Sequence, residues 1–66
     1  MTAQLIDLGS SKVNKTVVVK NEKALHKEIQ KYLFSKGWGM YETNEPDVWE
    51  IEAGFRVVGK VKILEV

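Results

Sequence analysis

The spacing of apolar residues along the chain changes from about two residues to about 3.6 and back again, as expected for strands on either side of one helix. Residues 3–8 are apolar enough for a first strand. In residues 13–20 the Val and Thr content is high, and Val13, Val17 and Val19 fall on one face. Gly and Ser residues between the two segments supply turn chemistry. We therefore predict two strands joined by a tight turn.

A helix over residues 22–36 is predicted by apolar residues that recur at helical spacing, namely Leu25, Ile29, Tyr32 and Leu33. Asn21 is a good N-cap for this helix. Gly37 directly follows it, in the position where Gly commonly takes the left-handed conformation that ends a helix. In such an ending Trp38 folds back against Leu33. The sequence therefore gives Trp38 a structural role.

Three further strands are predicted after the helix, over residues 38–43, 48–52 and from Phe55 onward. A Pro-containing turn at 44–47 and a short hairpin at Ala53-Gly54 separate them. Gly59 interrupts one face of the last strand, which suggests a bulge, a bend, or room for the helix to lie against the sheet. The order β-β-α-β-β-β predicts an α+β fold in which one helix packs on one face of a mostly antiparallel sheet. A β-grasp-like arrangement fits this order.

The chain of 66 residues is long enough for one small domain, which we place over residues 1–66. Its 44% apolar and 29% charged residues are typical of a globular protein, and it has no Cys to form disulfides. Stability must therefore come from packing. The predicted core consists of Val17, Val19, Leu25, Ile29, Leu33, Phe55, Val57 and Val61.

Residues with catalytic or metal-binding chemistry are few and badly spaced. His26 is the only His and has no nucleophile nearby in sequence, so we assign it no role. Five carboxylates lie close together in sequence without the spacing of a calcium loop, at Glu42, Glu45, Asp47, Glu50 and Glu52. We interpret them as a solvated hairpin face. The protein is therefore expected to be non-enzymatic, with no catalytic residue, metal, cofactor or small-molecule substrate.

Six aromatic residues are more than a core of this size can bury well. We expect some of them to be partly exposed, and the candidates for binding a partner are Phe34, Trp49 and Tyr41. Trp49 belongs to the core instead if its face of the strand meets the helix. Short strands also leave sheet edges, which can pair with another chain. The leading hypothesis is a small interaction module that binds a protein partner, or a second copy of itself as a homodimer, through exposed aromatics and a sheet edge.

Nucleic-acid binding is the alternative, because one side of the predicted helix carries Lys residues beside an aromatic ring. The candidate residues are Lys12, Lys15, Lys23, Lys27, Lys31 and Phe34. Lys side chains bind phosphates, and a Phe ring can stack on a base. The net charge of +1 and the pI of about 8.0 are low for a dedicated nucleic-acid binder.

The chain has neither a basic start followed by an apolar stretch, as in a signal peptide, nor an apolar run long enough to span a membrane. Its longest aliphatic run is the three Val residues 17–19. We therefore expect an intracellular, cytoplasmic protein with no membrane partner.

Overall fold

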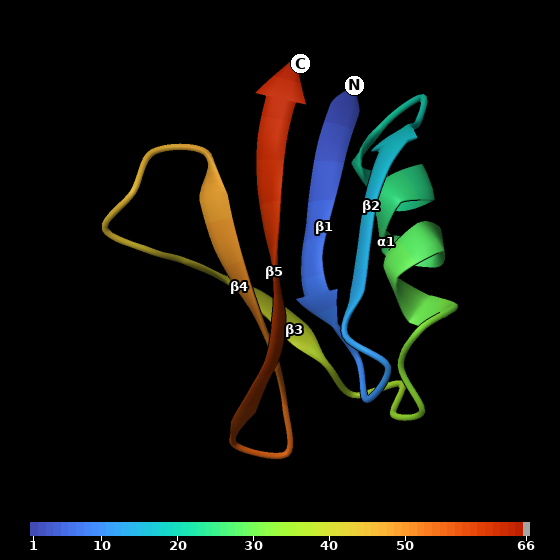
Figure 1. The fold of residues 1–66 in the computed structure, drawn as a ribbon, viewed down its shortest axis with the longest axis vertical. Coiled ribbons are helices and arrows are strands. Elements are labelled where there is room, and N and C mark those ends of the chain that lie inside the picture. Colours follow the sequence, from blue (N-terminus) through green and yellow to red (C-terminus); the bar gives the residue numbers. More distant parts are fainter. Residues whose placement is uncertain (66) are drawn as a thin grey trace.

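The computed structural model describes residues 1–65, which form one sheet of five strands and one helix (Figure 1). The elements are β1 (Thr2–Leu8), β2 (Val13–Val18), α1 (Glu22–Gln30), β3 (Gly39–Glu42), β4 (Val48–Ala53) and β5 (Arg56–Glu65). The strand order across the sheet is β2-β1-β5-β4-β3, and every neighbouring pair is antiparallel. The predicted α+β class and element order are confirmed.

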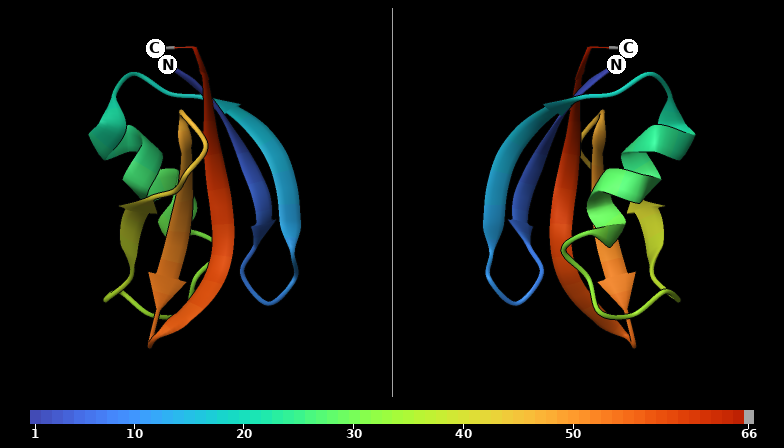
Figure 2. Two further views of the ribbon diagram at one scale, coloured as in Figure 1. Left: turned by 90° about the vertical axis from the view of Figure 1, so that its left-hand side faces the viewer. Right: turned by 90° about the vertical axis from the view of Figure 1, so that its right-hand side faces the viewer.

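The sheet is curved, and α1 lies on its inner side (Figure 2). The hairpin β1–β2 and the meander β3–β4–β5 meet where β1 pairs with β5. As in a β-grasp-like arrangement, the last strand, β5, lies beside the first strand, β1. In this sheet the two strands run antiparallel. Because Thr2 pairs with Glu65, both ends of the described chain lie at the same end of the molecule.

The core lies between α1 and the inner face of the sheet. Leu25 and Ile29, four residues apart on α1, are almost completely buried, as expected for the apolar stripe of a surface helix. They pack with sheet residues Ala3, Leu5, Leu8, Val17, Ile51 and Val61. Among residues 1–65 every fully buried side chain is apolar. The predicted core positions Val17, Leu25, Ile29 and Val61 are confirmed.

Two predicted core residues, Phe55 and Val57, are exposed instead. Gly59 pairs with Ile51 but Val57 pairs with Glu52, so β5 has one extra residue at this point. Such a bulge breaks the two-residue alternation of faces, and Val57 therefore lies on the outer face, 53% exposed. Phe55 lies in the turn and is fully exposed. Val19 and Leu33 are half-buried against the core.

The predicted irregularity at Gly59 is confirmed, and close packing explains why this position holds a Gly. A Cβ on Gly59 would lie 2.7 Å from Leu8 Cδ1 and 2.9 Å from Leu8 Cα, closer than atoms can approach without a shift. The Gly9 N–H donates to the Val58 carbonyl at 2.8 Å. The bulge of β5 is thus joined directly to the end of β1.

The helix is shorter than the sequence pattern predicted, because it ends at Gln30 and not near residue 36. Asn21 caps its start as predicted, accepting from the Ala24 N–H at 2.9 Å. The prediction for its end is wrong, since Gly37 is not among the glycines with positive φ. The next residues form a tighter turn, in which Tyr32 and Leu33 donate to carbonyls three residues earlier.

Candidate functional site

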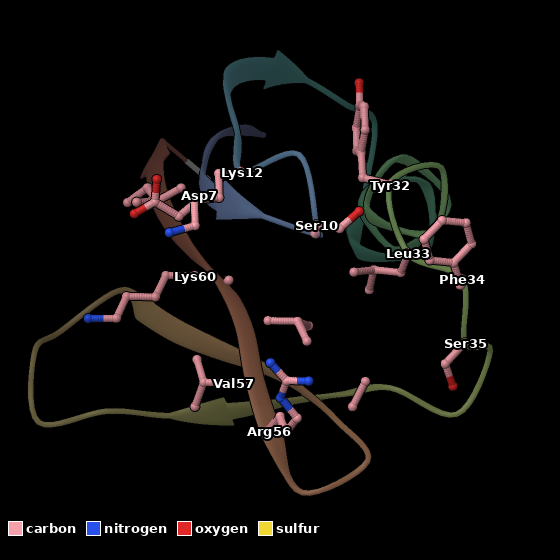
Figure 3. A pocket seen from close by; sticks show the side chains of 15 residues that line it. Asp7, Ser10, Lys12, Tyr32, Leu33, Phe34, Ser35, Arg56, Val57 and Lys60 are labelled. Atoms are coloured by element: carbon pink, nitrogen blue, oxygen red, sulfur yellow. The ribbon is translucent and has the colours of Figure 1, made fainter.

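Three connections come together at the end of the molecule opposite the chain ends (Figure 1). A groove lies between them. The connections are the β1–β2 turn, residues 31–38 after α1, and the β4–β5 turn. The groove has a volume of about 720 Å³. Figure 3 shows its lining, which includes Lys12, Tyr32, Leu33, Phe34, Arg56 and Lys60.

The wall of the groove is apolar where it meets the core. Leu33 and Val58 line the groove and also pack against the buried core cluster. Val58 is the extra residue of the β5 bulge, so the irregularity at Gly59 brings it to this position. A ligand in the groove would therefore contact side chains supported by the core, which favours binding of an apolar group.

The backbone at this end of the molecule is unusual. Asp7, Lys12 and Phe55 have φ values of 47°, 50° and 66°, in the left-handed region that non-Gly residues seldom adopt. Gly9 and Gly54 are also left-handed, at 76° and 58°. Residues held in such conformations are frequent at binding sites and cost about 1–3 kcal/mol each when strained. This region therefore differs from the regular layers of the core.

Phe34 is the most exposed of the large hydrophobic residues that line the groove, with 97% of its surface accessible. The segment that carries it is fixed by one side chain, that of Gln30. Its Nε2 donates to the carbonyls of Leu33 and Ser35, both at 3.1 Å. Its Oε1 accepts from Trp38 Nε1 at 2.7 Å. The exposed ring is thus carried by backbone that already has a defined conformation.

Trp38 does fold back onto the helix as predicted, although by different contacts. Its ring lies against His26, with centroids 5.1 Å apart and planes at 50°. A hydrogen bond from Trp38 to Gln30 holds the ring at the helix, whereas the sequence pattern predicts that a left-handed Gly37 brings it there. His26 therefore has a packing contact with Trp38, and among residues 1–65 it belongs to no group of side chains that could hold a metal ion.

Charged groups around the groove are mostly cationic. Lys12, Arg56 and Lys60 line it together with one carboxylate, Asp7. The Asp7 carboxylate is engaged, since its Oδ1 accepts from Asn14 Nδ2 at 3.2 Å. Sequence reasoning missed Arg56 and Lys60 as candidate residues. Nothing in the local pattern of the last strand marks them, because the groove exists only where three distant connections meet.

The three aromatic residues predicted to bind a partner do not share one surface. Phe34 lines the groove, whereas Tyr41 lies on β3, 54% exposed and opposite Glu50. Trp49 is half-buried and opposite Val61, on the face of the sheet that carries the core. Trp49 pairs with Glu42, the residue after Tyr41 on β3. Because successive residues of a strand point to opposite faces, Tyr41 and Trp49 lie on opposite faces of the sheet.

The lysines of the nucleic-acid hypothesis are also dispersed. Lys31 Nζ donates to Glu28 Oε1 at 2.8 Å, and this hydrogen bond lowers the pKa of Glu28 and raises the pKa of Lys31. Lys15 Nζ contacts the Tyr32 hydroxyl at 3.4 Å. Exposed Lys23 and Lys27 are on α1. Only Lys12 lines the groove with Phe34, while Lys31 and Phe34 border a smaller hollow beside it of about 220 Å³.

The acidic residues between positions 42 and 52 do not converge on a metal site. Within residues 1–65 no three His, Asp or Glu side chains are placed to hold an ion. Glu50 and Glu52 are on the outer face of β4, opposite Lys60 and Val57 respectively. Glu50 and Lys60 are thus directly opposite on neighbouring strands, an arrangement in which opposite charges stabilise the sheet.

The sheet has two edges, formed by β2 and β3. β3 has only four residues, and β2 carries Lys15 in its middle. Short edge strands and a charged residue on an edge both disfavour pairing with another chain. The groove is therefore a better candidate interface than either edge.

Comparison of the chain with protein-family models, with curated proteins and with solved structures finds no match. In the part of the chain that the structure describes, no helix has the length and apolar character needed to cross a membrane.

Proposed function

We propose that the protein is a non-enzymatic interaction module that binds a segment of a partner protein in its groove, with Phe34 as the anchoring residue. The observation that supports this most is the 97% exposure of Phe34 beside an apolar wall. A Phe side chain exposed to water is unfavourable for the free protein, since burying it contributes about 1.5–3 kcal/mol. Aromatic residues are enriched in the centres of protein interfaces for this reason.

The fixed segment around Phe34 adds to this proposal. Gln30 bonds the segment at three points, so the aromatic ring is carried by a backbone that needs little further ordering on binding. Ordering a mobile loop lowers affinity, and a site that is already ordered avoids that cost. Nucleic-acid binding has less support, because Lys31 is paired with Glu28 and the remaining lysines are spread over different elements.

The test uses a phage-displayed library of random peptides selected on the wild-type protein, followed by calorimetric titration of the best peptide. Phe34→Ala should weaken its binding at least about tenfold, because interface anchors typically contribute 2 kcal/mol or more. Phe55→Ala is the matched control, since Phe55 is also exposed but does not line the groove. That variant should bind within about twofold of wild type.

Equal binding by wild type and Phe34→Ala, or the selection of no peptide, would contradict the proposal. A fluorescein-labelled oligo-dT titrated against the same proteins tests the alternative. Strong, salt-dependent binding that is lost in Lys27→Glu and further weakened in Phe34→Ala would favour nucleic-acid binding by the helix face. Both exposed Phe variants should melt near the wild-type temperature, so that lost binding is not lost folding.

A further inference from the structure

We infer that the groove selects acidic segments, in which a carboxylate binds to Arg56 while an apolar residue contacts Phe34. This inference rests on the proposed function, because it names the chemistry of the partner segment for the same groove. The first argument is charge complementarity. Three cationic side chains and one carboxylate line the groove, although the whole chain has a net charge of only +1. The surplus of positive charge is therefore local to this site.

The state of these charged groups supports the inference further. Two hydrogen bonds of 3.2 Å join Asp7 to Asn14: the Asp7 backbone N–H donates to Asn14 Oδ1, and Asn14 Nδ2 donates to the Asp7 carboxylate. Among residues 1–65, the side chains of Lys12 and Arg56 have no hydrogen bond or ion pair. The Asp7 carboxylate thus accepts a hydrogen bond within the protein, whereas the Arg56 guanidinium is free to bind a ligand.

The direction of the side chains distinguishes Arg56 from Lys60. In Figure 3 the Arg56 guanidinium extends to the side of β5 where Leu33, Phe34 and Ser35 lie. The amines of Lys60 and Lys12 lie on the opposite side, where Asp7 lies. Lys60 also pairs across the sheet with Glu50. Arg56 therefore combines an unpaired charge with a position that faces the apolar side of the groove.

An acidic peptide matches this arrangement better than a neutral one. A guanidinium donates two parallel hydrogen bonds to a carboxylate, and such charge-assisted bonds are stronger and more directional than bonds between neutral groups. Next to the apolar wall formed by Leu33 and Val58, the effective dielectric constant is lower than in water, which strengthens the attraction. Phe34 would then bury against an apolar residue of the same segment.

The experiment compares the best library-selected peptide with a second version in which every Asp and Glu is replaced by Asn and Gln. The selected peptides should be enriched in Asp and Glu, and the neutral version should bind the wild type at least about tenfold more weakly. Raising the salt from about 50 mM to about 200 mM should weaken the acidic peptide and leave the neutral one nearly unchanged.

The protein variants are Arg56→Gln, Arg56→Lys and Lys12→Gln, with Lys62→Gln as the matched control. Lys62 is an exposed cation on the same strand as Arg56 that does not line the groove. Arg56→Gln should weaken the acidic peptide about tenfold and Lys12→Gln less, while Arg56→Lys keeps part of the affinity because it keeps the charge. Lys62→Gln should change affinity less than about twofold.

Each of the following outcomes would overturn the inference. If the peptides depend on Phe34 but are not acidic, or if Arg56→Gln behaves like Lys62→Gln, the groove binds peptides without selecting charge and only the proposed function stands. If the wild type forms a dimer without peptide and Arg56→Gln abolishes it, the groove binds a second copy. If oligo-dT displaces the acidic peptide at equal concentration, the cations bind phosphate. Absence of any Phe34-dependent peptide would overturn the proposed function itself.

Discussion

The layer between α1 and the sheet differs from the groove end of the molecule in both composition and backbone. In the layer, Leu25, Ile29 and Ile51 are completely or almost completely buried. At the groove end, by contrast, an unpaired Arg, an exposed Phe and several left-handed residues lie together. Regular helix and strand geometry forms the first region, and turns and one bulge form the second.

This difference shows which residues serve stability and which are free to serve binding. A buried apolar side chain stabilises the fold through the area it removes from water. Phe34 and Arg56 remove little area in the free protein, since both are exposed. Their substitution should therefore affect a complex much more than the folded chain. Substitutions can test this difference. The loss in the free energy of unfolding should be largest for a core residue and smallest for a surface residue.

The largest loss of stability is expected in the core, for Ile51→Ala. Ile51 is completely buried on the central part of β4, and truncation would leave a cavity in addition to the lost apolar burial. The free energy of unfolding should fall by about 2–5 kcal/mol, measured by urea denaturation. Phe34→Ala, its counterpart at the groove, should change the same quantity by less than about 0.5 kcal/mol. Equal losses for the two variants would remove the distinction between the regions.

A smaller loss is expected for Gly59→Ala, where the two regions meet. The new Cβ would contact the backbone of Leu8, which cannot move as a flexible side chain could. Overpacking of this kind costs about 1–3 kcal/mol. Because the bulge also places Val58 in the groove wall, the variant should bind the selected peptide more weakly even under conditions where it is fully folded. Unchanged denaturation and unchanged binding would contradict the close packing described here.

A change near zero is expected for Gly37→Ala. The sequence pattern predicts a left-handed residue and hence a loss of stability, whereas the structure shows no positive φ at Gly37. The nearest atom to an added Cβ is Ser35 Oγ at 3.7 Å, an ordinary contact. Stability should be unchanged or raised by less than about 1 kcal/mol, because Ala reduces the freedom of the unfolded chain. A clear decrease in the thermal unfolding temperature would instead support a left-handed Gly37 at the helix end.

The smallest effect concerns the surface ion pair of Lys31 and Glu28 and depends on pH. The hydrogen bond from Lys31 lowers the pKa of Glu28 below its ordinary value of 4.5. A lowered pKa in the folded state contributes stability above the ordinary value, and this contribution is lost as pH falls below it. Lys31, with a raised pKa, contributes below its own ordinary value and loses that contribution as pH rises. The difference in stability between wild type and Glu28→Gln should therefore be largest near neutral pH.

The sequence predicts the fold well where one periodicity persists along an element. The order of strands and helix, the Asn21 cap and the buried pair Leu25 and Ile29 all follow from local patterns. The prediction fails where a long-range contact replaces a local one. Gln30 ends the helix by bonding to residues up to eight positions away, and no cap rule based on neighbouring residues includes such a bond.

The candidate site is less predictable than the fold. Phe34 could be selected from the sequence because a core of this size cannot bury six aromatics. Arg56 could not, since its position beside Phe34 depends on how the β4–β5 turn meets the segment after α1. The bulge at Gly59 also moves Val57 to the outer face and Val58 to the groove, which a strict alternation along the strand assigns wrongly.

The pairing of Thr2 with Glu65 in the middle of the sheet determines how the molecule resists mechanical force. Because β1 and β5 are antiparallel neighbours whose outer ends lie together, a pull on the two ends of the described chain acts across the strands. Hydrogen bonds between antiparallel strands also run across the strands, so this load reaches them one after another, starting at Thr2. We therefore expect β1 and β5 to separate at low force along this direction, because their hydrogen bonds break one at a time. A pull between the groove end of β1 and the opposite end of β5 would instead shear the same bonds together.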